Sequence, residues 1–216
     1  MRPLLAELIG TYFLVFVVGL VVGGLAPAEW APIAVSAVLC VCVCAFGHAS
    51  GAHFNPAVTI AAWLRRRINA GRMIGYIIAQ LLGAYLAVLT CTLMDSWATP
   101  APLVLAGSSQ IIVAEGIFTF LLVTVILNVA ATKATEGNQY FPFAIAGAVL
   151  AGALCVGTIS GAVFNPAVGT GLVAMGALPS AKLILYVASQ LAGAIAAAWV
   201  HGVMYPDEAG RVPPLG

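Results

Sequence analysis

Two asparagines, Asn55 and Asn165, stand in separate halves of the chain, and each is followed by Pro-Ala. Both lie in the pattern Ser-Gly-Ala-X-Phe-Asn-Pro-Ala-Val, where X is His53 or Val163. Asparagine caps a helix N-terminus and proline fits the first helical turn, so each motif predicts a helix start. Two such N-termini at one place would concentrate about half a positive charge each and repel cations. The two amide side chains would then donate N–H groups to a neutral solute.

The backbone before each asparagine supplies the complementary group. Its carbonyl oxygens cannot all bond within helices, so they predict a ladder of acceptors along a path. A path with one wall of acceptors and one apolar wall suits small neutral solutes that form hydrogen bonds, with selectivity set by width and field. The predicted acceptors are the carbonyl groups of Gly51, Ala52, His53, Gly161, Ala162 and Val163.

The composition places this path in a membrane. The chain has 216 residues, of which 62% are hydrophobic and 7% charged, and its mean hydropathy is +1.09. Soluble domains carry ~25% charged residues, so the chain is read as an integral membrane protein. A net charge of +1 suggests no nucleic-acid partner.

Six apolar segments are long enough to span a bilayer, at ~20 residues per crossing. The first, which contains Glu7, is read as a membrane helix and not as a cleavable signal. Two further segments, Asn55 to Leu64 and Asn165 to Met175, are too short to cross and predict half-helices that start near the membrane centre. The spanning segments are 4–26, 31–50, 70–94, 110–131, 140–159 and 180–204.

The chain therefore consists of two similar halves. Tyr76 and Gln80 recur as Tyr186 and Gln190, at the same offset that relates the two asparagines. Three crossings per half is an odd number, so the second half must be inverted and the half-helices enter from opposite sides. We expect one channel domain over 1–216, with repeats at 4–94 and 110–204, a loop at 95–109 and a cytoplasmic tail at 206–216.

Basic residues predict the orientation of the chain. With the N-terminus inside, only Lys182 lies outside, and both termini are cytoplasmic. The inside residues are Arg2, Arg65, Arg66, Arg67, Arg72, Lys133 and Arg211. We read Arg65 to Arg67 as a topology anchor.

The paired Asn-Pro-Ala motifs, the inverted repeat and a Glu-x-x-x-Thr pattern at Glu7 and Glu115 resemble the aquaporin and aquaglyceroporin family, also called major intrinsic proteins. The resemblance covers roughly Leu4 to Tyr205. It implies an all-α bundle of six transmembrane helices with two re-entrant half-helices, a pore in each subunit and a homotetramer. It also implies that Glu7 and Glu115 brace the loops, in preference to the proton relay that intramembrane acids often form. The pore motif comprises Asn55, Pro56, Ala57, Asn165, Pro166 and Ala167.

The chain departs from the family pattern at the selectivity filter. Most relatives carry an arginine three residues after the second asparagine, where this chain has Val168. By spacing, the other filter positions are Val35, Ala153 and Ala162. Such a wide apolar ring predicts passage of glycerol-like polyols and neutral metalloids, a modest flux of water, and cation exclusion by the central dipoles alone. Arsenite and methylated arsenicals are favoured by analogy with bacterial relatives that also carry valine there.

Cysteines and histidines receive simpler interpretations. An odd number of cysteines within apolar runs argues against disulfides, so we read them as packing residues. The alternative is a thiol that touches the path, with Cys155, two residues beyond Ala153, as the candidate. His48 and His53 have no third ligand beside them and are read as loop supports, so no metal or cofactor is expected. The cysteines are Cys40, Cys42, Cys44, Cys91 and Cys155.

A passive channel for small uncharged solutes, in a bacterial inner membrane, is our leading interpretation of this path. The alternative is a structural or junctional protein with the same fold and little conduction. An enzyme is disfavoured because no nucleophile and base are paired in matching segments. An energised transporter is disfavoured because Glu7 and Glu115 are the sole intramembrane acids available for coupling.

Overall fold

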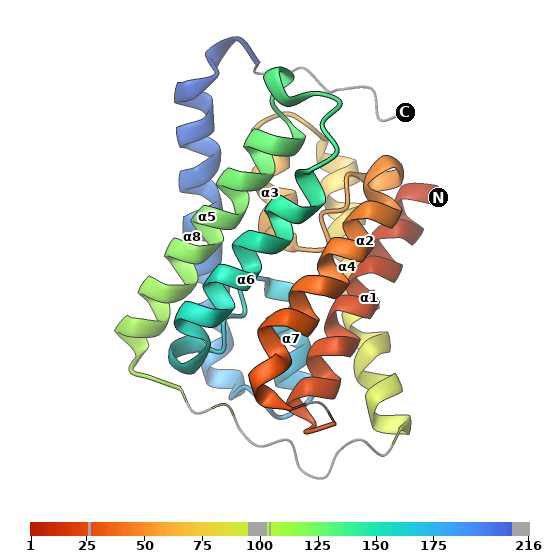
Figure 1. The fold of residues 1–216 in the computed structure, drawn as a ribbon, viewed down its shortest axis with the longest axis vertical. Coiled ribbons are helices and arrows are strands. Elements are labelled where there is room, and N and C mark those ends of the chain that lie inside the picture. Colours follow the sequence, from red (N-terminus) through yellow and green to blue (C-terminus); the bar gives the residue numbers. More distant parts are fainter. Residues whose placement is uncertain (26, 95–102, 104, 209–216) are drawn as a thin grey trace.

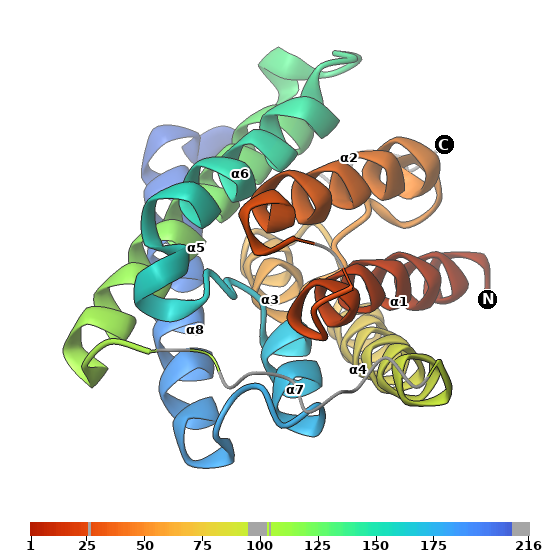
Figure 2. The ribbon, with the colours of Figure 1, turned by 60° about the horizontal axis from the view of Figure 1, so that its bottom comes forward.

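The computed structural model describes residues 1–25, 27–94, 103 and 105–208. Within these residues, six helices are long and apolar enough to cross a membrane (Figure 1). Two shorter helices, α3 (Pro56–Leu64) and α7 (Pro166–Ala174), lie between them (Figure 2). The six long helices are α1 (Arg2–Val22), α2 (Ala31–Ser50), α4 (Ala70–Leu93), α5 (Ser108–Ala130), α6 (Phe141–Ser160) and α8 (Ser180–Met204).

The helix boundaries follow from local sequence. Both α2 and α6 have proline in their first turn and stop at a glycine, Gly51 or Gly161, in the left-handed region (φ +88° and +79°). The first predicted span, 4–26, is too long by a turn at its end. Helix α1 stops at Val22, because Gly23 caps it and Gly24 reverses the chain at φ +77°.

The two repeats contain equivalent pairs of closely packed helices. Helix α1 lies along α4, α5 lies along α8, and α2 contacts α6 across the repeat boundary. Both close pairs depend on a glycine, since a Cβ on Gly83 or Gly193 would collide with the backbone carbonyl of Leu8 or Gly116. Small residues permit this approach of helix backbones in a lipid environment. The short helices contact the opposite repeat, α3 against α8 and α7 against α4.

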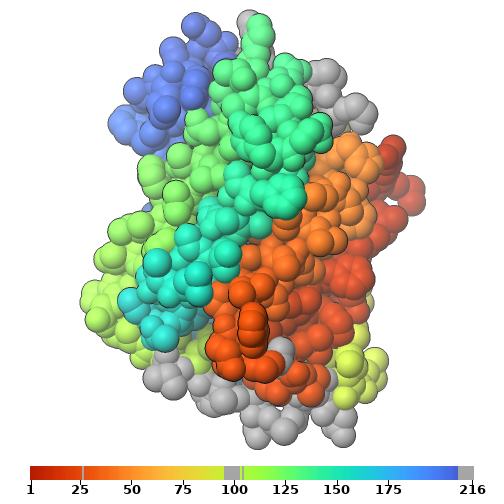
Figure 3. Space-filling model, viewed as in Figure 1, coloured from red at the N-terminus to blue at the C-terminus, as the bar shows by residue number. Residues whose placement is uncertain are grey.

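The distribution of polarity is that of a membrane protein. Large apolar side chains such as Phe143 and Ile184 are 69% and 73% exposed, whereas Glu7 and Glu115 are fully buried. Figure 3 shows one outer face, where α6 and α2 lie side by side and cover the interior. The two short predicted half-helices are present, and each starts directly after its asparagine. The loop predicted at 95–109 lies largely outside the described residues, as do Arg211 and the tail beyond Glu208.

Candidate functional site

The two asparagines hold the two half-helices against each other. Each side-chain oxygen caps its own helix, with Asn55 Oδ1 accepting from Ala57 N and Asn165 Oδ1 from Ala167 N, both at 2.9 Å. Each side-chain nitrogen crosses to the other repeat. Asn55 Nδ2 donates to the carbonyl of Phe164 at 2.9 Å, and Asn165 Nδ2 donates to that of Phe54 at 2.8 Å.

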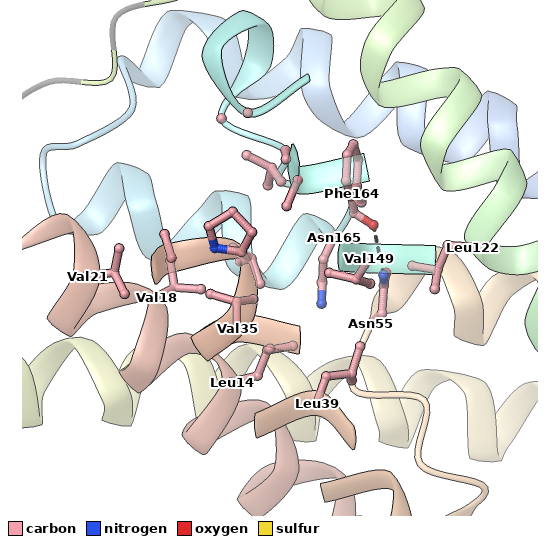
Figure 4. Close-up of a pocket in the computed structure, with 18 of the residues that line it drawn as sticks. Leu14, Val18, Val21, Val35, Leu39, Asn55, Leu122, Val149, Phe164 and Asn165 are labelled. Carbon is pink, nitrogen blue, oxygen red and sulfur yellow. Dashed lines mark hydrogen bonds between the residues drawn. The ribbon is translucent and has the colours of Figure 1, made fainter. Parts of the chain in front are cut away.

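This exchange leaves donors for a solute. An amide nitrogen carries two N–H groups, and each asparagine uses one of them in the exchange. Figure 4 shows both side-chain nitrogens within the pocket, with Leu14, Leu39 and Val149 around them. The centre of the cavity therefore presents two N–H donors, two helix N-termini and an apolar wall.

The chain reaches each asparagine through strained backbone. Ala52 and Phe54 have positive φ (51° and 49°), and Ala162 and Phe164 repeat these values (51° and 47°). Non-glycine residues seldom adopt this conformation, and it places successive carbonyl groups outside any helix. Within the described residues, no hydrogen bond uses the carbonyl oxygens of the six predicted acceptors, Gly51, Ala52, His53, Gly161, Ala162 and Val163.

Two buried carboxylates hold these loops. Glu7 accepts from Ser50 Oγ (2.6 Å), His53 N (2.9 Å) and Phe54 N (2.7 Å). Glu115 accepts from the equivalent atoms, Ser160 Oγ (2.6 Å), Val163 N (3.0 Å) and Phe164 N (2.7 Å). Because these donors lie at the end of the preceding helix and in the loop before each asparagine, the carboxylates fix the path of the strained backbone.

Four further residues support the loops, and sequence reasoning did not assign them a role. The Tyr76 hydroxyl donates to the Ser50 carbonyl at 2.8 Å, and Gln80 Nε2 donates to Glu7 at 2.8 Å. Tyr186 and Gln190 make the same bonds to Ser160 (2.6 Å) and Glu115 (2.8 Å). These four residues recur at the offset that relates the two asparagines, and this recurrence indicates the repeat. It does not predict that their side chains form hydrogen bonds with the loops.

A cavity of about 570 Å³ contains both asparagines, and we call it the asparagine cavity. All four filter positions assigned by spacing lie on its wall, namely Val35, Ala153, Ala162 and Val168. No arginine or lysine lies among its described lining residues. Cys155 is exposed and is absent from this lining, although its neighbours Ala153 and Leu154 belong to it.

A second cavity of about 1040 Å³ opens at the end of the molecule that carries Arg67 and Lys133, and we call it the arginine cavity. Its wall includes Cys44 and His48, and also Gly51, the one predicted acceptor residue that does not line the asparagine cavity. Arg67 Nη2 lies 3.0 Å from Glu208 Oε2 and ties the end of the described chain to this cavity.

Arg65 and Arg67, which the sequence predicts to be a topology anchor, are both buried and make contacts within the protein. Arg65 Nε donates to His201 Nδ1 at 3.1 Å, and its Nη2 donates to the Tyr205 carbonyl at 3.2 Å. Burial, followed by repulsion from Arg67, lowers the pKa of the Arg65 guanidinium from its usual value. Sequence reasoning missed this cluster because its partners lie far away along the chain, in and beyond the last helix.

Six spans around two opposed half-helices, with a cavity at their junction, define a membrane channel fold. The protein-family model described as Major intrinsic protein matches residues 1–146 and 106–212. The chain therefore belongs to the major intrinsic protein family, a family of channels and not of enzymes.

Individual relatives agree with this assignment. The chain is 38% identical to "Glycerol uptake facilitator protein-like 6" of Lactiplantibacillus plantarum, over 96% of this chain and 100% of that protein. It is 35% identical to Nodulin-26 of Glycine max, over 96% of this chain and 80% of the relative. Among solved structures, the aquaglyceroporin from Plasmodium falciparum matches with a TM-score of 0.75 and 19% identity, covering 96% of this chain and 98% of that one.

Proposed function

We propose that this protein is a passive channel for small uncharged solutes with hydroxyl groups. The solutes are glycerol-like polyols and neutral metalloids such as arsenite and methylated arsenicals, with some water. The observation that carries the proposal is the lining of the asparagine cavity, which includes the apolar side chains of Val168 and three other small residues and, among its described residues, no arginine or lysine. The name of the glycerol uptake facilitator-like relative supports the polyols, and the metalloids rest on family analogy.

Cation exclusion follows from the centre of this cavity. The N-termini of α3 and α7 meet there, and their partial positive charges oppose entry of any cation. A neutral hydroxyl solute accepts hydrogen bonds from Asn55 and Asn165 and donates to the unpaired carbonyl groups. We further propose that the channel is a homotetramer in a bacterial inner membrane, with both termini cytoplasmic.

The test is solute flux into proteoliposomes. Stopped-flow light scattering compares water and glycerol, and arsenite loading is measured as trapped arsenic. The wild-type protein is expected to admit glycerol and arsenite well above empty liposomes. Val168→Arg is expected to lower both fluxes about tenfold, which corresponds to a barrier higher by about 1.4 kcal/mol.

Val168→Leu is the matched control, since it adds bulk without charge or donors and is expected to lower flux less. If wild-type flux equals that of empty liposomes, the proposed function is wrong and the junctional alternative is favoured. If the wild type conducts and Val168→Arg leaves the glycerol and arsenite fluxes unchanged, the apolar ring is not what admits these solutes.

A further inference from the structure

The two cavities meet at three residues, not at the ring around Val168. His53, Val58 and Ile126 contribute to the walls of both the asparagine cavity and the arginine cavity. We call these three residues the waist. The four filter positions taken from the family pattern all lie inside the asparagine cavity, on one side of the waist. A solute that crosses the protein must therefore leave the asparagine cavity through the waist.

The inverted repeat gives each waist residue a counterpart on the other side of the asparagines. Val58 corresponds to Val168 and His53 to Val163, at the offset that relates Asn55 to Asn165. Ile126 corresponds to Val18, at the offset that relates Glu115 to Glu7. All three counterparts line the asparagine cavity (Val18 is labelled in Figure 4).

The two sets differ in size. The counterparts are three valines, whereas the waist replaces two of them with larger side chains, an imidazole and an isoleucine. The backbone is the same in both, since Ala52 and Ala162 share a φ of 51° and the same carboxylate contacts hold both loops. Because the loops have an equivalent backbone, we expect the larger side chains of His53 and Ile126 to leave less room at the waist than the valines leave at its counterpart.

The imidazole of His53 is fixed in this passage. Its Nδ1 lies 3.1 Å from Thr59 Oγ1, and its ring meets that of Tyr76 edge-on at 5.2 Å between centroids. The second repeat has Gly169 in place of Thr59 and Val163 in place of His53, so it contains no such support. These two contacts hold the His53 ring at the waist.

The hydrogen bonds of Thr59 also determine which nitrogen of the His53 ring is free to accept a hydrogen bond from a solute. A hydroxyl has one proton, and that of Thr59 is donated to the Asn55 carbonyl at 3.0 Å. Thr59 Oγ1 also accepts from Gln80 Nε2 at 2.9 Å, so toward His53 it has only a lone pair to offer. His53 Nδ1 must therefore donate, which leaves Nε2 of the neutral ring as an acceptor beside Gly51.

We infer that the waist formed by His53, Val58 and Ile126 is the selectivity-determining constriction of this channel. It discriminates by size and offers an acceptor to hydroxyl groups, and the wide ring around Val168 leaves solute size unrestricted. This inference rests on the proposed function, because it names the residues that limit flux through the same path. Selectivity by pore width and by lining acceptors is the physical basis.

The test widens each passage separately. Ile126→Ala and Ile126→Val widen the waist, and Val18→Ala makes the matched change at the counterpart. Flux of water, glycerol and a five-carbon polyol is measured in proteoliposomes by stopped-flow light scattering. Ile126→Ala is expected to raise flux of the five-carbon polyol relative to water about tenfold, as expected for methylene-scale changes in an apolar pocket. Ile126→Val gives a smaller rise, and Val18→Ala changes the ratio less than twofold.

Water flux in the same vesicles shows whether each variant is folded, and Ile126→Val is conservative enough to retain the fold if Ile126→Ala does not. A rise with Val18→Ala equal to that with Ile126→Ala overturns the inference, as does a ratio unchanged by both Ile126 variants. Absence of wild-type glycerol flux is a separate result, since it contradicts the proposed function before any variant is compared.

Discussion

Asn55 and Asn165 exchange the same hydrogen bond, because each amide nitrogen donates to the carbonyl immediately before the other asparagine, at 2.9 Å and 2.8 Å. The same side chains cap α3 and α7. A single residue type thus holds two helix starts together and keeps one N–H of each amide for the cavity. The junction of the two repeats is consequently one hydrogen-bonded unit.

The first prediction concerns this junction. Asn55→Ala removes a cap and leaves the buried Phe164 carbonyl without its partner, so it is expected to lower the free energy of unfolding by about 2–4 kcal/mol. Thermal unfolding in detergent measures the loss. Asn69→Ala removes only the exposed cap of α4 and is expected to cost about 1 kcal/mol. Equal decreases in melting temperature for the two variants would show that the hydrogen-bond exchange between Asn55 and Asn165 adds nothing to stability.

The second prediction concerns the carboxylate under the second loop. Glu115→Gln replaces an oxygen that accepts from the loop with an NH₂ group that faces other donors. The expected loss of stability is about 2–4 kcal/mol, since hydrogen bonds to a charged acceptor are lost at a buried site. Glu29→Gln, at an exposed site, is the control. A melting temperature as high as that of the control would contradict a bracing role for Glu115.

The third prediction concerns helix packing. Gly193→Ala places a Cβ against the Gly116 carbonyl and is expected to separate α5 from α8 and reduce the yield of folded protein. Gly147→Ala meets nothing within 4 Å and is expected to be neutral or stabilising by up to about 1 kcal/mol, from helix propensity. Size-exclusion chromatography of the two variants in detergent gives the comparison. Similar yields would mean that α5 and α8 can shift apart without loss.

The fourth prediction concerns the end of the described chain. Glu208 pairs with Arg67 and accepts from the Lys133 amide, so Glu208→Gln is expected to accelerate amide hydrogen exchange at residues 205–208. The side chains of Arg67 and Glu208 are only 8% and 14% exposed, so loss of this charged hydrogen bond is expected to lower the free energy of unfolding by about 1.5–3 kcal/mol. Glu136→Gln lines the same cavity and is the control. If amide hydrogen exchange at residues 205–208 is as slow in Glu208→Gln as in Glu136→Gln, the ion pair between Arg67 and Glu208 does not hold this segment in place.

The sequence alone is enough to predict the membrane class, the six spans, the two half-helices and the inverted repeat. These depend on local properties: apolar length, capping by asparagine and proline, and the recurrence of residues at one offset. It also selected four positions that line the asparagine cavity, because Val168 and Ala162 follow from spacing to Asn165. Helix α1 ends a turn before the predicted boundary, because Gly24 reverses the chain within the apolar run.

Which distant groups meet depends on how the whole helix bundle packs. The exchange between Asn55 and Phe164, the contact of Arg65 with His201, and the waist at His53 and Ile126 join segments far apart in sequence. No local pattern encodes such contacts, because they arise when two inverted halves bury their polar groups against each other in lipid. The sequence thus located the channel and its asparagines, and packing brought His53, Val58 and Ile126 together where the two cavities meet.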